Sequence, residues 1–233
     1  MPSSSRPLSS GQIRSLALLS FDHLLNHLGV AARSQARRVL PELEDVSCAA
    51  FLTWEKCTPE GAVASPAPGE LPKPVARHGG WARAALRGCT GTFQPNPVGP
   101  LIRQLAIGSA VRDTRFPPVT LAEVPLLRAT VSILHSFEPI TDKNDWQIGT
   151  HGIEIEFLRH GRRVAGATFL PSVMVDHGFS HDDTFDYLVD KAGLRLADFL
   201  EAYEHPSAAL SVVITRYQTA TSSADYAEWL EQC

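Results

Sequence analysis

The stretch Leu86-Arg87-Gly88-Cys89-Thr90-Gly91-Thr92-Phe93 places one cysteine between two glycines, two residues after an arginine, where a strand is expected to end. The glycines permit positive φ and leave no side chains in the way of a small ligand. A thiolate is the nucleophilic form of cysteine, and a nearby cation such as Arg87 favours it. Cys89 is therefore a candidate nucleophile. The alternative is a small buried apolar side chain in a bulged strand.

Outward from this stretch, the apolar residues alternate between helical and strand spacing. Hairpins are frequent and no βαβ rhythm occurs, so the pattern predicts an α+β fold. We expect helices over 10–30, 99–111, 182–192, 196–203 and 223–231, and strands over 48–54, 81–93, 126–137, 152–157, 163–170 and 209–218.

Two segments have the composition of irregular chain. Residues 58–80 contain five prolines and several glycines, which predicts a long insertion loop. Residues 1–10 are rich in serine and proline, which predicts a flexible N-terminus. We expect the remainder, residues 11–232, to form a single domain.

Composition narrows the class of protein. A net charge of −4 over 233 residues argues against a general nucleic-acid-binding surface. No apolar run approaches the roughly 20 residues of a membrane span. The four cysteines show no CxxC spacing, which is typical of a reducing compartment, so we expect a cytoplasmic or nuclear protein. No cofactor is predicted. No metal site is predicted either, because Gly178 interrupts the helical spacing of His177 and His181 and no third ligand is evident.

Further polar residues lie near predicted element ends. Arg112, Asp113 and Arg115 precede a rigid Pro-Pro, and two arginines can form a fork for a carboxylate or phosphate, with the aspartate orienting one of them. A structural Arg–Asp salt bridge is the alternative. His151 is a candidate general base for the cysteine, or else a turn histidine bonded to backbone groups.

Glu154 and Glu156 alternate with apolar residues. This pattern predicts that both lie on the solvated face of a strand.

Several blocks resemble the AMMECR domain family in the family's order, from about Gln12 to Leu230. Besides the opening stretch, they are Arg112–Pro118, Glu123–Pro125 followed by the strand Val131–Phe137, Trp146–Gly152, Thr215–Tyr217 and Tyr226–Glu228. The resemblance implies a single, strongly curved, barrel-like mixed β-sheet flanked by helices, built from two pseudo-repeated β-rich halves. It does not imply a reaction. The 58–80 insertion departs from shorter relatives, and Thr90 stands where relatives often have isoleucine.

The residues and the resemblance together predict a protein that binds a small ligand or a modified residue around the 86–93 motif, with thiolate chemistry as a possible activity. The catalytic candidates are Cys89 and His151. The ligand-binding candidates are Arg87, Gly88, Thr90, Gly91, Thr92, Arg112, Asp113 and Arg115. The alternatives are a non-catalytic protein-interaction adaptor and an RNA-associated regulator, so the expected partner is a small molecule or another protein.

Overall fold

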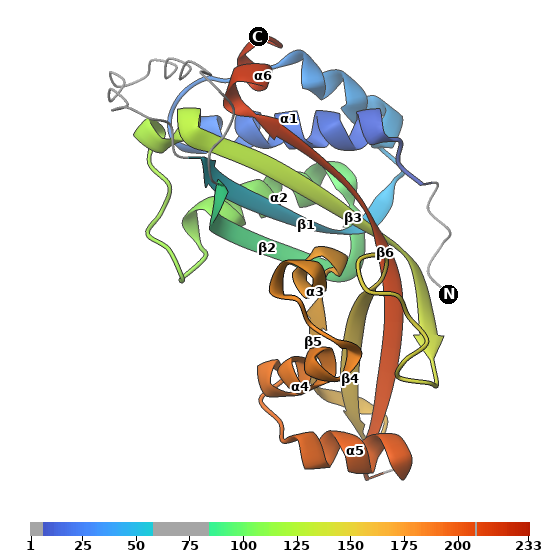
Figure 1. Ribbon diagram of the computed structural model, residues 1–233. Coiled ribbons are helices and arrows are strands. Elements are labelled where there is room, and N and C mark those ends of the chain that lie inside the picture. The colour runs from blue at the N-terminus through green and yellow to red at the C-terminus, as the bar shows by residue number, and fades with distance from the viewer. Residues whose placement is uncertain (1–6, 58–83, 208) are drawn as a thin grey trace. The chain divides into compact units, whose positions relative to one another are not determined.

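The computed structural model describes residues 7–57, 84–207 and 209–233 and has an α+β fold (Figure 1). The α+β prediction is confirmed. The two pseudo-repeated halves stay a prediction, and the predicted 58–80 loop lies outside the described residues, as do residues 1–6.

Six strands form one sheet in the order β2-β1-β3-β6-β4-β5. The β1–β2, β4–β5 and β4–β6 pairs are antiparallel. The strands are β1 (Ser47–Cys57), β2 (Ala84–Pro97), β3 (Leu127–Ile140), β4 (Gly152–Arg159), β5 (Arg162–Phe169) and β6 (Ser211–Asp225). Contacts divide the chain into a first unit, residues 1–133 and 220–233, and a second unit, residues 134–219.

The first unit contains α1 (Ser10–His27), α2 (Val98–Val111), α6 (Tyr226–Leu230) and the 3-10 helices Gln35–Leu43 and Leu121–Leu126. Helix α1 begins at a capping box, in which Ser9 and Gln12 bond each other's backbone amides. Trp54 of β1 is fully buried, packs edge-on against Phe21 of α1 with ring centroids 5.0 Å apart, and donates to the Ala106 carbonyl of α2. Helices α1 and α2 therefore cover the same face of β1.

The second unit contains α3 (Pro171–His177), α4 (His181–Lys191) and α5 (Leu196–Glu204). Its core joins the apolar face of β4 to α4 and α5, with Ile155, Phe157, Phe185 and Phe199 at most 2% exposed. The predicted β4–β5 hairpin is confirmed. It turns at His160-Gly161, where both residues have positive φ, as a tight hairpin requires.

The C-terminal elements differ from the prediction. The expected helix over 223–231 begins only at Tyr226, because β6 continues to Asp225. Hydroxyl groups hold this end of β6 to β3: Ser223 bonds Thr130, and Thr221 donates to Ser132. These cross-strand bonds compete with the local preference of serine and threonine for helix starts. Helix α3, which the sequence pattern did not indicate, begins with Pro171 in its first turn.

Candidate functional site

Two glycines of the 86–93 stretch allow close packing within the first unit. A Cβ at Gly88 would collide with the carbonyl oxygen of Ser109 in α2. A Cβ at Gly91 would collide with the ring of Phe51 on the neighbouring strand. Backbone atoms of α2 therefore occupy the space that a side chain at position 88 would fill. This contact seats β2 against α2, and Gly88 does not line the pocket described below.

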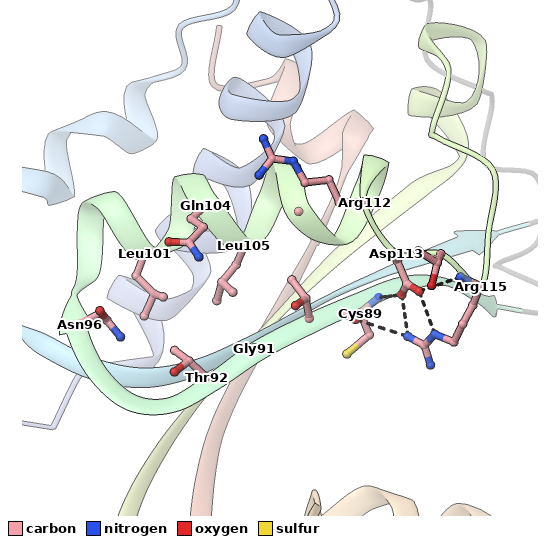
Figure 2. Close-up of a pocket in the computed structure, with 13 residues that line it drawn as sticks. Cys89, Gly91, Thr92, Asn96, Leu101, Gln104, Leu105, Arg112, Asp113 and Arg115 are labelled. Carbon is pink, nitrogen blue, oxygen red and sulfur yellow. Dashed lines mark hydrogen bonds and ion pairs between the residues drawn. The ribbon is translucent and has the colours of Figure 1, made fainter.

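The side chains of β2 project from two faces. Gly88 and Thr90 face α2, since their nearest neighbours there are Ser109 and Gly108. Cys89 lies between them in sequence and opposite Thr53 on β1, whose hydroxyl donates to its sulfur over 3.2 Å. Figure 2 accordingly shows the sulfur on the side of β2 away from the helix. The thiol therefore belongs to the face of the sheet that α2 does not cover.

Asp113 connects the end of α2 to the cysteine strand. Its carboxylate accepts hydrogen bonds from the Cys89 amide (2.9 Å) and from Nε (2.9 Å) and Nη2 (2.6 Å) of Arg115, and Nη2 also donates to the Cys89 carbonyl (Figure 2). The hydrogen bonds from Arg115 hold the pKa of Asp113 well below its usual range, and the same pairing raises the pKa of Arg115. The predicted Arg–Asp salt bridge is therefore present.

Arg112 differs from Arg115. Its side chain is exposed, and it makes no hydrogen bond or ion pair within the part of the chain that the structure describes. Two guanidinium groups thus accompany a single carboxylate at this end of α2. The local balance is one positive charge, and it is carried by a side chain that is available to a ligand.

A pocket of about 610 Å³ lies along β2 and α2 and brings most of the predicted site residues together (Figure 2). From the predicted set it includes Cys89, Thr90, Gly91, Thr92, Arg112, Asp113 and Arg115. The sequence reasoning missed its other members, Asn96, Leu101, Gln104, Leu105, Gly108 and Thr114. One signal was available for Gln104, a polar residue that lies three positions after Leu101 and therefore on its side of the helix.

Arg87 is held apart from this pocket. It is the extra residue of a β-bulge, since Leu86 lies opposite Glu55 and Gly88 lies opposite Trp54. Its buried guanidinium donates twice to Glu123, each over 3.1 Å. Burial alone would raise the pKa of Glu123, but the bonds from Arg87 and Lys56 outweigh it and lower this pKa to about 2. Arg87 is therefore committed to an ion pair, and it does not line the pocket.

His151 belongs to the second unit. Its Nδ1 accepts a hydrogen bond from the Gln147 amide over 3.0 Å, and it is not among the residues that line the pocket along β2. The arrangement matches a turn histidine bonded to backbone. A role as general base for Cys89 stays a prediction.

The expectation for Glu154 was wrong. This glutamate is 8% exposed, and burial, followed by the nearby Glu156 carboxylate, raises its pKa to about 7 although Arg163 opposes the shift. Arg163 lies 2.6 Å from Glu156 and 3.6 Å from Glu154, so it pairs mainly with Glu156, the more exposed of the two carboxylates. Alternation placed Glu154 on the face opposite the core of β4, but alternation does not reveal whether that face is covered.

Among the described residues, no group of three or more histidine, cysteine, aspartate or glutamate side chains has an arrangement that would hold a metal ion. Gly178 ends α3 with a left-handed backbone and separates His177 from His181, as the sequence indicated. None of the helices that the structure describes combines the length and the apolar character needed to cross a membrane.

Comparison with known proteins gives one family. The AMMECR1 family model matches residues 19–220. An uncharacterized protein of Arabidopsis thaliana is 32% identical over 218 residues, covering 93% of this chain and 87% of its own. An uncharacterized protein of Schizosaccharomyces pombe is 34% identical over 145 residues, which cover 62% of this chain and 70% of the length of the relative.

A solved structure shares the fold. The crystal structure of an uncharacterized protein from Pyrococcus horikoshii aligns over 94% of both chains with a TM-score of 0.67 at 22% identity. At this identity the likeness supports the architecture alone.

Proposed function

This chain belongs to the AMMECR1 family, and from that premise we propose that it binds a small organic anion in the pocket along β2 and α2. The main observation in support of this proposal is that one end of the pocket is positively charged. Arg115 is neutralised by Asp113, whereas Arg112 has no partner within the described residues. A carboxylate or phosphate oxygen beside Arg112 would form charge-assisted hydrogen bonds, which are stronger than neutral ones.

The rest of the lining suits the body of such a ligand. Gln104 and Asn96 offer amide groups and Thr90 a hydroxyl, so both donors and acceptors are available. Leu101 and Leu105 also line the pocket, each with 3% of its surface exposed. Pockets that bind small molecules commonly combine an apolar wall with a few polar groups that fix orientation. The ligand class that fits is a small anion with a polar, hydrogen-bonding body.

Thiolate chemistry at Cys89 is a second candidate. It is favoured by the Thr53 hydroxyl, because a hydrogen bond donated to sulfur stabilises the thiolate. This chemistry would take place on the face of β2 away from α2, so a ligand held by Arg112 and a substrate of Cys89 need not be the same molecule. The RNA-associated alternative stays a prediction.

The test is a thermal-shift screen of small carboxylates and phosphate monoesters, with inorganic phosphate as the minimal probe. Compounds that raise Tm with concentration are then titrated calorimetrically. We expect Arg112→Gln to weaken binding about tenfold or more, since a hydrogen bond to a charged group contributes about 1.5–3 kcal/mol. Arg103→Gln is the matched control, because Arg103 is an exposed arginine on the same helix and does not line the pocket.

Two results would contradict the proposal. One is a screen in which no anion binds saturably. The other is a ligand whose affinity falls equally in Arg112→Gln and Arg103→Gln, which would indicate a response to net charge alone.

A further inference from the structure

Helix α4 carries an exposed aromatic side chain. Tyr187 is 51% exposed, and its ring stacks on Phe179 with centroids 4.5 Å apart and planes 14° apart. Phe179 in turn stacks with His177 at 5.2 Å. The tyrosine hydroxyl makes no hydrogen bond within the described part of the chain. Tyr187 therefore presents ring surface and a polar tip to solvent while its ring is stacked on Phe179.

Three aspartates lie near this tyrosine on α4, and so does one cation, Lys191, four residues after it. Asp183, Asp186 and Asp190 are exposed and lie four residues before, one before and three after Tyr187, so the first and last share its side of the helix. Hydrogen bonds from the side chain and then the backbone of Ser180 lower the pKa of Asp183, which keeps it charged. Asp186 and Asp190 make no ion pair with any described residue.

Asp183 caps the start of α4 together with Ser180, but Asp186 and Asp190 are not explained by the stability of the helix itself. Aspartate is one of the poorer helix formers. Asp190 also lies in the last turn, where the helix dipole disfavours negative charge. A choice that is locally unfavourable and has no internal partner points to a role outside the helix.

The same aromatic cluster already holds one cation. The Lys191 ammonium lies 4.7 Å from the ring centroid of Phe169, and this ring packs against Phe179 at 6.0 Å. The cluster thus accommodates a positive charge against an aromatic face, and the Tyr187 ring offers a second such face that no cation of the described chain covers.

We propose that the outer face of α4 docks an arginine-bearing segment of a partner protein. One guanidinium stacks on Tyr187, and neighbouring arginines pair with Asp186 and Asp190. Arginine fits better than lysine because its planar group both stacks on a ring and binds a carboxylate through two parallel hydrogen bonds. Negative charge on this face disfavours nucleic acid and anionic lipid. The proposal is independent of the pocket along β2.

Fluorescence anisotropy on the full chain tests it, with a labelled peptide of alternating arginine and glycine as the probe, at about 150 mM salt to screen weak long-range attraction. A lysine–glycine peptide of equal length is the matched ligand, and we expect it to bind more weakly. Tyr187→Ala should lower the affinity for the arginine peptide about three- to fivefold, the size expected for an exposed cation–π contact. Tyr187→Phe keeps the ring and should keep the affinity.

The charge contribution is tested with a double variant. Asp186→Asn with Asp190→Asn should weaken binding at least about threefold, as expected for losing two exposed charge pairs. Glu44→Gln with Asp45→Asn removes the same charge from an exposed part of the first unit and should leave the affinity unchanged. The proposal is overturned if the peptide does not bind saturably, if Tyr187→Ala binds like the unaltered protein, or if both double variants lose affinity equally.

Discussion

Replacing Gly88 by alanine tests the close contact between β2 and α2. The added methyl group would collide with the Ser109 carbonyl oxygen, a backbone atom that no change of rotamer can move. Carbon and oxygen ordinarily approach no closer than about 3.3 Å, so the strand and the helix must separate. Overpacking of this kind costs up to about 3 kcal/mol. Restricting the unfolded chain offsets up to about 1 kcal/mol, which leaves a net loss of about 2 kcal/mol.

Scanning calorimetry measures the effect. For a chain of this length, a loss of about 2 kcal/mol lowers Tm by about 4–8 °C. Gly108→Ala is the matched control on the facing helix, because its methyl group would lie 3.5 Å from Thr90 Cγ2, an ordinary contact. This control should unfold at or above the Tm of the unaltered protein, since alanine forms helix better than glycine by about 1 kcal/mol. If Gly88→Ala unfolds within about 1 °C of the unaltered protein, the reasoning is refuted.

Three further predictions concern charge and thiol reactivity. Because the folded-state pKa of Glu154 is raised to about 7, stability should fall as pH rises from about 4.5 to 7 and then level off. Glu154→Gln should abolish that fall in urea titrations, whereas Glu156→Gln, which removes the smaller cause of the shift and leaves the burial, should reduce the fall without abolishing it. Burial raises the pKa of Cys48 to about 11, so its thiol should be alkylated more slowly than that of half-buried Cys89 in the native protein. Mass spectrometry measures the two alkylation rates, and equal rates would contradict the burial of Cys48. Asp22→Asn should lower the free energy of unfolding by about 3 kcal/mol in denaturant titrations, because this fully buried carboxylate accepts hydrogen bonds from a backbone amide, an indole and an arginine. A change below about 1 kcal/mol would refute that role.

Element prediction succeeded where the signal is local. The helix expected over 10–30 became α1 because Ser9 caps its start and Gly29 follows its end with positive φ. The hairpin at His160-Gly161 was equally visible, since few residues tolerate that backbone. Prediction failed at residues 223–225, where hydroxyl groups bond to β3 across the sheet and keep serine in a strand. Side chains from distant sequence decided that outcome.

The site shows the same division. Arg112, Asp113 and Arg115 were found from their position at a helix end, and the structure brings them to the Cys89 strand. The bulge at Arg87 was not visible in the sequence, because it depends on how β1 and β2 align. The pairing of Arg87 with Glu123 likewise depends on residues 36 positions apart.

The sequence by itself determined most helices and strands, the α+β class and the family, because these depend on residue spacings of about two and 3.6 and on motifs within a few positions. Only the tertiary structure decided that the Cys89 thiol faces away from α2, that Arg115 rather than Arg112 is neutralised by Asp113, and that Glu154 is buried. The physical reason is that exposure and electrostatic partners are set by what lies against a residue in space. Those neighbours come from chain segments whose alignment no local pattern encodes.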